Sequence, residues 1–477
     1  MPKKQKVENS MKPNKRVGFD YSALMDATID DIAKRHDFEA GSLETIPPLS
    51  TGLLAHDLVM GGGIRPAWFT MFGAEQSAKT TSALTIMSSA VKAGVPLVSF
   101  SDYEGSTASA RSYVDSILRS VGLKIKADDV FGRKDASGKW AVRPTVRYKS
   151  ATVLEDFFDF MHTVLQELPD KKLVNGKWWL VFEDNKLNKA KVGEFVDSAM
   201  AKKHGKGLWV PTEDGNLQAL FLVDSYPAMN PRAQDKEDTN NALAIHARAF
   251  SQQLPRVKGR MAQKMVAVVG INQLRAVPMA MYGPSEMEPG GNALKLYSDC
   301  RVKHTSRSLS AAPFTPKQGA KVKDEQEAST EVEGGVDTYR YVHIKGTKNK
   351  LWTPQREAFF RIWVEDAKGV ARGIDPVFDT IFYLKETGQL SGKRIKFVLN
   401  LEGLGQAKKP VSWSTLKKWV LGNREEMTNI SLSLGYKPMS LRAFCFKQME
   451  KGTGESLYTV AKSSKVKGDN ETENADE

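Results

Sequence analysis

Short apolar runs alternate with amphipathic segments along the middle of the chain. Four runs have the length and the β-branched or aromatic content of buried strands: AWFTMF (67–72), VPLVSFSD (95–102), LQALFLVDS (217–225) and MVAVVGINQ (265–273). Between the first two, TSALTIMSSAVKAG (81–94) has helical spacing and ends at a glycine. This alternation predicts an α/β fold with a mostly parallel central sheet flanked by helices.

Polar stretches divide the chain around this core, which we expect to span residues 46–372. Each stretch departs from the strand and helix patterns in composition or in length. They predict a disordered basic arm at 1–18, an amphipathic helix at 19–45, an inserted subdomain at about 170–216, a flexible loop at about 306–337, a small α+β C-terminal domain at 373–460 and a disordered tail with an acidic end at 461–477.

The composition limits the class of protein. Two cysteines, Cys300 and Cys445, are too few for a disulfide framework, and the sequence has no apolar run that would cross a bilayer and no secretory signal. We therefore expect a protein of a reducing, cytoplasmic compartment without a membrane partner. The net charge of +13 favours a polyanion such as nucleic acid as partner, although plain solubility or a role beside the ribosome also explains it.

The stretch GAEQSAKTT follows the first expected strand and precedes the expected helix. It matches the phosphate-binding pattern G-x-x-x-x-G-K-[ST], except that Ala78 replaces the second glycine. In this pattern Lys79 reaches the terminal phosphates and the Thr80 hydroxyl holds Mg²⁺; an ordinary turn before a helix is the alternative. A methyl group is compatible with φ < 0 at Ala78 and strained at φ > 0. The other residues of the stretch are Gly73, Ala74, Glu75, Gln76, Ser77 and Thr81.

Two carboxylates follow the next strands. Glu104, in SFSDYEG, is placed to orient water against a terminal phosphate, or else simply to begin a helix. Asp224 ends an apolar strand, where a carboxylate supports the shell of Mg²⁺. Three signals in this order predict a nucleotide site with Mg²⁺.

The segment from Gly270 to Arg301 leaves a buried strand through Gln273 and Arg275, continues as a loop of Met, Pro and Gly residues and enters the helical pattern GGNALKLYS. Its cations suit phosphate contacts and its large apolar side chains suit insertion between bases, so it predicts a site for single-stranded nucleic acid. Packing of the methionines within the loop is the alternative. The candidate residues are Arg275, Met279, Met281, Tyr282, Lys295 and Arg301.

These motifs together resemble the RecA family. N-Q-[IL]-R, a short loop and then G-G-N-A-L-K-[FL]-Y is similar to the second DNA-binding loop of its bacterial members, and adds Gly290, Gly291 and Asn292 to the DNA-binding candidates. Further matching motifs are STGLLAHDLVMGGG, DYEG, FLVDS, HARAFSQQL, KGTKNK and FDTIFYL. The resemblance covers roughly residues 50–384 and implies a RecA-like P-loop ATPase core.

The resemblance implies a strand-exchange recombinase. Such an enzyme forms a helical filament of its own subunits on single-stranded DNA, hydrolyses ATP at the subunit interfaces and pairs that DNA with a homologous duplex. Its cofactors would be ATP and Mg²⁺. Its partners would be single-stranded and double-stranded DNA, further copies of itself and single-strand-binding and mediator proteins. The helix at 19–45 would serve oligomerisation, and the C-terminal domain DNA binding or regulation.

Residue roles follow from the resemblance by position. Glu104 would activate water, Gln273 would sense the γ-phosphate, and Lys348 and Lys350 of KNK would reach the ATP of the neighbouring subunit; a solvated strand end is the alternative for the two lysines. The first DNA-binding loop would lie at 230–248. The residues carried over to phosphate and Mg²⁺ are Gly73, Lys79, Thr80, Thr81 and Asp224, and those carried over to DNA phosphate are Arg248 and Arg275.

Departures from the family pattern leave choices open. DYEGSTASAR is closer to the eukaryotic and phage form of its motif than to the bacterial one, so adenine would stack on either Arg111 or Tyr113. A related phage recombinase also lacks the glycine replaced by Ala78, and the size of the departures favours a phage-encoded member. One rival is a replicative helicase with the same core, which would lack GGNALK. Another is a DNA-filament protein that holds ATP with little hydrolysis, supported by Ala78.

Overall fold

The computed structural model of the chain describes residues 46–107, 110–150, 153–213, 215–233, 242–276, 286–307, 328–332, 335–365, 373–393, 396–399, 410–422, 425–433 and 435–451. The predictions for the arm, the helix at 19–45 and the tail concern residues outside these ranges, as do those for Met279, Met281 and Tyr282. Within the described ranges, no helix is long and apolar enough to cross a membrane.

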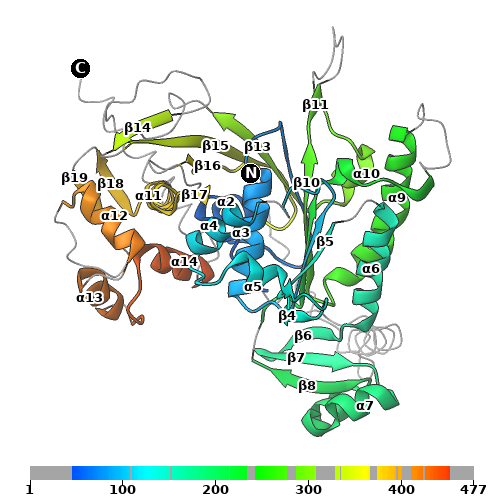
Figure 1. Cartoon of the computed structure of the whole chain (residues 1–477). Helices are drawn as coiled ribbons and strands as arrows, with labels where there is room; N and C mark the ends of the chain where they lie inside the picture. The colour runs from blue at the N-terminus through cyan, green and yellow to red at the C-terminus, as the bar shows by residue number, and fades with distance from the viewer. Residues whose placement is uncertain are drawn as a thin grey trace, which may run out of the picture. The chain divides into compact units, whose positions relative to one another are not determined.

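A ten-stranded sheet forms the centre of the fold (Figure 1). Its order is β17-β16-β15-β13-β1-β10-β9-β2-β5, with β14 paired to β15 beside this path. The strands are β1 (Trp68–Gly73), β2 (Leu97–Asp102), β5 (Val146–Ser150), β9 (Ala219–Asp224), β10 (Val266–Gln273), β13 (Cys300–Arg307), β14 (Ala328–Val332), β15 (Gly335–Asn349), β16 (Glu357–Glu365) and β17 (Gly373–Ile374). Pairs from β5 to β13 are parallel and the remaining ones antiparallel, which confirms the predicted mostly parallel α/β fold.

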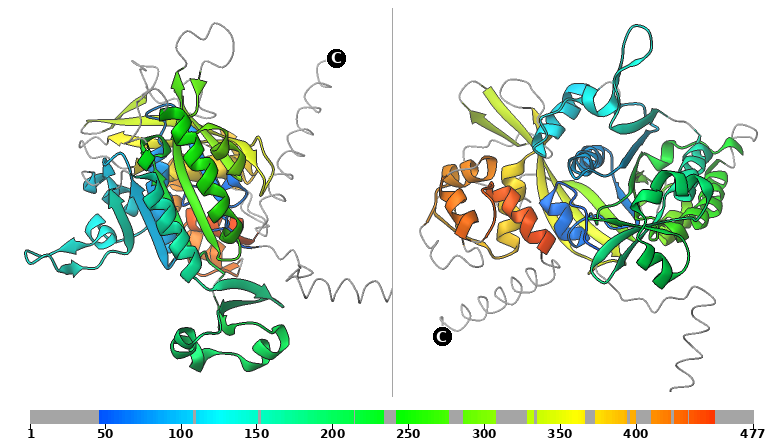
Figure 2. Two further views of the ribbon diagram at one scale, coloured as in Figure 1. Left: turned by 90° about the vertical axis from the view of Figure 1, so that its right-hand side faces the viewer. Right: turned by 90° about the horizontal axis from the view of Figure 1, so that it is seen from below.

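Helices cover both faces of this sheet (Figures 1 and 2). One face carries α6 (Leu154–Glu167), α9 (Ala242–Met261) and α10 (Gly291–Tyr297), and the other carries α2 (Leu54–Met60), α3 (Lys79–Lys92), α4 (Arg111–Ser120) and α5 (Ala127–Phe131). Side chains along β9 alternate between the two cores, Phe221 on the first face and Leu220 and Leu222 on the second. Burial on both faces explains the unbroken apolar runs in the sequence.

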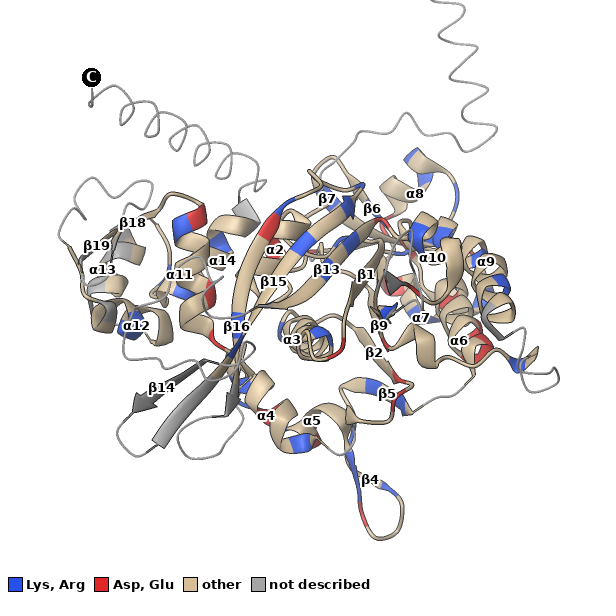
Figure 3. Ribbon diagram, turned by 90° about the horizontal axis from the view of Figure 1, so that it is seen from above, with Lys and Arg blue, Asp and Glu red and all other residues tan. Residues whose placement is uncertain are grey.

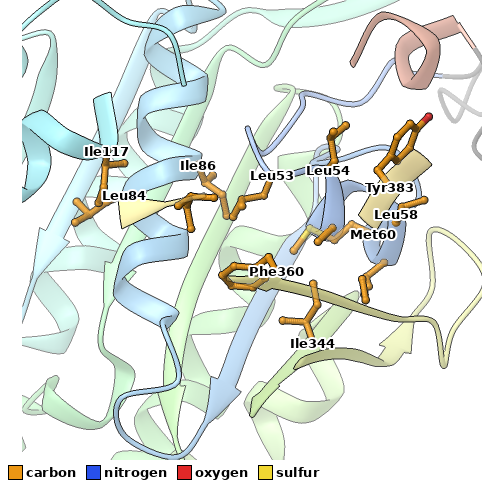
Figure 4. Packing of buried hydrophobic residues seen from close by; sticks show 14 of the residues in the cluster. Leu53, Leu54, Leu58, Met60, Leu84, Ile86, Ile117, Ile344, Phe360 and Tyr383 are labelled. Carbon is orange, nitrogen blue, oxygen red and sulfur yellow. The ribbon is translucent and has the colours of Figure 1, made fainter. Parts of the chain in front are cut away.

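The larger core joins α2 and α3 to the antiparallel strands (Figure 4). Leu53, Leu84 and Phe360 are buried together there. The same cluster continues into the C-terminal region through Leu384 and Phe444. That region has the expected mixture of helices and strands: α11 (Pro376–Glu386), β18 (Leu390–Lys393), β19 (Lys396–Leu399), α12 (Trp413–Leu421), α13 (Glu425–Ser433) and α14 (Leu441–Lys451).

Two excursions lie outside the central sheet. A separate three-stranded sheet, β6 (Asp170–Val174), β7 (Lys177–Phe182) and β8 (Leu208–Thr212), occupies the segment expected as an inserted subdomain, with α7 (Lys186–Val192) and α8 (Ser198–His204) between its last two strands. A hairpin of β3 (Arg133–Lys134) and β4 (Trp140–Val142) precedes β5 and was not predicted.

One prediction about the loops is wrong in part. The segment 306–337 was expected to be a flexible loop, but 328–332 form β14 and 335–337 begin β15. The residues ASTEV and GVDTY pair across a short connection, and β-branched residues in both runs favour the strand. The polar composition on which the loop prediction rested therefore did not exclude pairing.

A buried ion pair ties the C-terminal region to the first helix. Both carboxylate oxygens of Asp379 accept hydrogen bonds from the backbone N–H groups at the start of α2, those of Leu54 and Ala55, each at 2.9 Å. Arg442 Nη1 lies 2.7 Å from the same carboxylate, and its Nη2 donates to the Gly52 carbonyl at 2.9 Å. The pair neutralises a charge that is fully buried and satisfies a helix end.

We expect Arg442→Ala to lower the free energy of unfolding by about 3 kcal/mol, because it leaves the Asp379 carboxylate buried without its cation. Denaturant unfolding measures this change. The exposed Lys417→Ala on α12 is the matched control and should change the value by less than about 0.5 kcal/mol. Equal effects of the two substitutions would show that the pair contributes no more than a surface cation.

Candidate nucleotide site and nucleic-acid interface

The phosphate loop connects β1 to α3 at the carboxyl edge of the parallel strands. Gly73 ends β1, and a Cβ atom there would lie 2.2 Å from the His304 carbonyl oxygen, so only glycine fits. Lys79 begins α3 and folds back over the loop: its Nζ donates to the carbonyls of Ala74 at 2.5 Å and Gly73 at 3.1 Å. The ammonium therefore already lies inside the turn that would surround phosphates.

Burial lowers the pKa of Lys79 below its usual value, an effect that the nearby carboxylates of Asp224, Glu104 and Glu75 oppose. The Lys79 ammonium is held by neutral acceptors, the carbonyls of Gly73 and Ala74 and, at 3.2 Å, the hydroxyl of Ser77. Phosphate oxygens would be stronger partners for it than these carbonyls, because both members of that pair carry full charge. The site is consequently suited to an anion of high charge.

Ala78 has a positive φ, the backbone conformation that is strained for a residue with a side chain. Its φ is 63° and its ψ 26°, in the left-handed region, and its side chain is buried. The neighbouring Gln76 also has a positive φ, 56°. Strain at Ala78 follows, since the left-handed conformation costs a residue with a Cβ roughly 1–2 kcal/mol. The loop keeps its shape because the surrounding contacts of Gly73 and Lys79 fix it.

The two residues expected to hold Mg²⁺, Thr80 and Asp224, lie beside the loop. Thr80 Oγ1 donates to Asp224 Oδ2 at 2.7 Å, while Asp224 Oδ1 is buried and accepts no hydrogen bond. Burial raises the pKa of Asp224 to about 7, with a further contribution from Glu104 and Asp102. A hydroxyl, a carboxylate with one unused buried oxygen and space for water and phosphate fit Mg²⁺, which prefers oxygen ligands and retains water.

Glu104 is held by two donors from neighbouring strands. Ser225 Oγ, just after β9, donates to Glu104 Oε1 at 2.6 Å, and Gln273 Nε2, at the end of β10, donates to the same oxygen at 2.8 Å. The sequence assigned roles to Glu104 and Gln273 but missed Ser225. Its only signal was its place directly after Asp224, which the parallel register puts beside the segment that carries Glu104.

A cavity of about 460 Å³ opens onto these groups. Its lining includes the phosphate loop, Glu104, Asp224 and Gln273, together with Tyr113, Arg340 and Trp363. Tyr113 and Arg340 contact the loop directly: the Tyr113 and Thr81 hydroxyls are 2.7 Å apart, and Arg340 Nη1 donates to the Gln76 carbonyl at 3.2 Å. Of the two candidates for stacking on adenine, only Tyr113 lines the cavity; Arg111 is exposed and pairs with Asp128. The sequence missed Arg340 and Trp363, because they come from β15 and β16, far along the chain.

Lys348 and Lys350 lie at the opposite edge of the sheet from the phosphate loop. The register aligns Gly73 with His304 and Ile344, whereas Lys348 aligns with Arg301 and through it with Thr70, three residues before Gly73, which places Lys348 roughly 10 Å back along the strands. Lys348 Nζ donates to the Lys295 and Leu296 carbonyls at the end of α10, at 2.7 and 3.0 Å. Neither lysine faces the phosphate loop of its own chain.

A third lysine lies beside these two. Lys258 of α9 forms an ion pair with Asp299, whose carbonyl accepts the backbone N–H of Lys350 at 2.8 Å. Burial, with the added repulsion of Lys350 and Lys348, lowers the pKa of Lys258 to about 8. Three lysines, of which Lys258 is paired with Asp299, thus gather at this end of the strands.

The base of the loop expected to bind DNA, within residues 270–301, follows β10 directly. Arg275 is exposed and lies in β11 (Arg275–Ala276), which pairs with β12 (Glu286–Met287); 277–285 lie outside the described residues. Gly290 and Gly291 take φ of 89° and 66° where the chain turns into α10, and the exposed Asn292 and half-buried Lys295 follow on that helix.

Two expectations about DNA contacts need correction. Arg301 forms a buried ion pair with Glu288, so its charge is neutralised inside the protein. Asn272 Nδ2 also donates to Glu288, at 3.4 Å, which fixes the end of the loop to β10. The segment 230–248 is not a loop throughout: 242–248 begin the helix α9, where the exposed Arg248 lies. The stretch NALAIHARAF has helical periodicity, but the loop was predicted from the family resemblance instead.

The fold is an α/β fold with a mostly parallel central sheet, and the loop after β1 has the geometry of a phosphate-binding loop. Residues 213–368 match the family model of the RecA N-terminal domain. The chain is 31% identical to protein RecA of Thermus aquaticus over 190 residues, which are 40% of this chain and 48% of that protein. It is 24% identical to protein RecA of Mesoplasma florum over 220 residues, 46% and 56% of the two chains.

These matches confirm that the chain is related to the RecA family. It spans about half the length of the relatives that it matches. A solved structure titled as the RadB recombinase aligns with 68% of this chain and 98% of its own, at 15% identity and a TM-score of 0.34. The family match includes Asp224, Gln273 and Lys348 and begins after the phosphate loop, whose assignment therefore depends on the geometry above.

We expect Ala78→Gly to raise the free energy of unfolding by about 1 kcal/mol, because glycine removes the cost of a left-handed φ at a site that needs it. Ala83→Gly, in the ordinary helical interior of α3, is the control and should lower it by about 1 kcal/mol. Denaturant unfolding of the nucleotide-free protein compares them. Destabilisation by both would mean that the loop does not strain Ala78.

The pKa of Asp224 makes stability depend on pH. Because the folded protein raises this pKa to about 7, it holds the proton more tightly than the unfolded chain, whose carboxyl has a pKa of about 4. The stability that the proton provides is present below about pH 4 and lost as the pH rises through about 7. Asp224→Asn keeps an acceptor for Thr80 and does not titrate.

The thermal midpoint of nucleotide-free Asp224→Asn should therefore exceed that of the wild type by a few degrees at pH 8, with a difference that shrinks toward pH 4. Differential scanning calorimetry across this range measures it. Glu75→Gln, at an exposed carboxylate of the same loop, serves as the control and should show no such trend. A lower midpoint for Asp224→Asn at pH 8 would contradict the shifted pKa.

Proposed function

We propose that the protein is a DNA-dependent ATPase that performs homologous strand exchange as a filament on single-stranded DNA. The observation that carries the proposal is the Gln273 hydrogen bond to Glu104. Gln273 is the last residue of β10, and Arg275 at the base of the DNA loop is two residues further on. One side chain thus joins the candidate water-activating carboxylate to the candidate DNA-binding segment.

In the proposed ATP complex, the phosphate loop and Lys79 bind the phosphates, and Thr80 and Asp224 hold Mg²⁺. Mg²⁺ would supply charge neutralisation between the β- and γ-phosphates. Glu104 Oε2, which is not the oxygen engaged by Ser225 and Gln273, is placed to accept a proton from water beside the terminal phosphate. Tyr113 and Trp363 offer aromatic faces to the base.

The proposed site is completed by a second subunit. Lys348 and Lys350 lie at the end of the strands away from their own phosphate loop, and their two ammonium groups are suited to the triphosphate of a neighbour. A cation at the γ-phosphate stabilises the charge that spreads over its oxygens during transfer. Filament formation on DNA would then be the condition for fast hydrolysis.

Further roles follow from the proposed strand exchange. Arg275, Arg248 and Lys295 would contact phosphates of single-stranded DNA, and the C-terminal region would assist with the duplex. Single-strand-binding and mediator proteins would act on the assembly, in a cytoplasmic compartment that includes that of a phage-infected host. We keep one second candidate, an ATP-binding filament protein with little hydrolysis, because Ala78 is strained at a φ of 63°.

Mixing two inactive variants tests the shared site. Lys348→Ala/Lys350→Ala should bind nucleotide as free protein and show little DNA-stimulated ATP turnover. Lys79→Ala lacks a working phosphate loop and keeps both lysines. Mixed filaments should recover part of the turnover, because the lysines of the Lys79→Ala subunit meet the intact loop of the double variant.

Co-assembly on DNA is verified separately, by energy transfer between labels on the two variants. A mixture of Lys79→Ala with Lys417→Ala is the reference, because Lys417→Ala leaves both the phosphate loop and the two lysines intact. No recovery at any mixing ratio, despite co-assembly, would contradict a site shared between subunits. Turnover by Lys79→Ala alone at the wild-type rate would contradict the ATP site itself.

A further inference from the structure

The hairpin of β3 and β4 extends from the edge of the central sheet. It interrupts the chain between α5 and the edge strand β5, and Figure 2 shows it pointing away from the sheet and its helices. Every residue from Arg133 to Ala141 is exposed. The hairpin thus contributes no core residue over that stretch, although the turn that closes it is well ordered by hydrogen bonds.

The ends of the hairpin meet at a glycine. A Cβ atom on Gly132 would lie 2.9 Å from the backbone nitrogen of Pro144, and Thr145 N donates to the Val130 carbonyl at 2.9 Å. The end of α5 and the start of β5 are thus in contact, and the hairpin between them is not needed to connect the two elements. Its exposed side chains are free to serve a partner.

The charge of the hairpin is strongly positive. Arg133, Lys134, Lys139 and Arg143 are exposed, against one acidic residue, Asp135. The basic positions of the hairpin are blue in the ribbon around β4 in Figure 3. The Asp135 carboxylate is used within the turn: its Oδ1 accepts from Ser137 N at 2.8 Å, Ser137 Oγ at 2.6 Å and Lys139 N at 3.1 Å. The cations face solvent without an acidic partner side chain at hydrogen-bond distance in the described hairpin.

An exposed aromatic ring lies among these cations. Trp140 has 49% of its surface exposed, more than any other tryptophan whose side chain the structure describes. Lys134 Nζ lies over its ring, 5.1 Å from the centroid. A ring and an ammonium are thus within reach of one nucleotide, which has an aromatic base and a phosphate. Stacking on an aromatic side chain requires an unpaired base, so this pairing of groups favours a single strand over a duplex.

The hairpin is distant from the base of the proposed second DNA loop. Val146, where β5 begins, is level with Val98, Leu220 and Ala267 across the sheet. Gln273 lies six residues beyond Ala267 along β10 and three strands away from β5, so the two bases are on the order of 25 Å apart. A ligand at the hairpin would be additional to any strand held by Arg275.

We propose that the β3–β4 hairpin is a second binding site for single-stranded DNA, in which Trp140 stacks on a base and Arg133, Lys134, Lys139 and Arg143 contact phosphates. The proposal rests on the proposed function in taking DNA as the polyanion. For a protein that pairs strands, such a site would hold a strand apart from the one in the filament.

The test compares full-length variants by fluorescence anisotropy with labelled oligothymidylate, over a range of salt concentrations and without nucleotide. Arg133→Ser/Lys134→Ser/Lys139→Ser/Arg143→Ser should lose at least about fivefold in affinity, and its dependence of log K on log salt should be less steep by up to about 3, since each phosphate contact on a single strand contributes about 0.7. Trp140→Ala should lose about tenfold on the single strand and nothing on a labelled duplex, while Trp140→Phe keeps most of the affinity.

The charge-matched control is Lys186→Ser/Lys191→Ser/Lys202→Ser/Lys203→Ser, which removes four exposed lysines from α7 and α8. Equal melting temperatures establish that all variants fold. If the quadruple hairpin variant has the same affinity and salt slope as this control, the proposal is overturned. The hairpin cations would then be suited to an acidic protein surface instead of DNA. Arg275→Ala, measured in parallel, tests the proposed DNA loop. If Arg275→Ala binds like the wild type while the hairpin variants lose affinity, the assignment of the loop fails and the proposal for the hairpin is supported.

Discussion

Parallel pairing of β2, β9, β10 and β1 brings the carboxyl ends of four strands to one edge of the sheet, and the rest of the site depends on it. Glu104 follows β2, while Asp224 and Gln273 are the last residues of β9 and β10. Their side chains meet across the strand ends because adjacent parallel strands are only about 4.8 Å apart. The phosphate loop continues from β1 at the same edge, so one set of strand ends positions all of these groups.

The same register places Lys348 at the opposite end of the strands from the phosphate loop of its own chain. Lys348 is at the other edge, held by the carbonyls that end α10, and this helix follows the DNA loop through Gly290 and Gly291. A conformational change in the proposed DNA loop would therefore be passed along α10 to the carbonyls that accept hydrogen bonds from Lys348. Gln273 gives a second connection, from Glu104 to Arg275. DNA occupancy would thus affect both halves of a site shared between subunits.

Much of this arrangement was predictable from local sequence. The strands β1, β2, β9 and β10 are continuous apolar runs, and Glu104 and Asp224 stand where those runs end, so the site followed once the sheet was parallel. Residues that enter from distant strands were not predictable: Trp363 and Arg340 reach the cavity through antiparallel pairing of β15 and β16, which no local pattern specifies. The φ of Ala78 depends on the contacts around the loop. The β3–β4 hairpin is held by a turn at Asp135 and Ser137 too short to give a periodic signal.

The most direct measurement is steady-state ATP hydrolysis by the wild-type protein with and without single-stranded DNA, with Lys79→Ala as the blank. If Gln273 joins Glu104 to the DNA loop and the lysines complete a neighbour's site, single-stranded DNA should raise turnover at least tenfold, and the stimulation should require enough DNA to hold several adjacent subunits. Turnover that is no greater with long single-stranded DNA than without it, or that does not exceed the blank, would contradict the account.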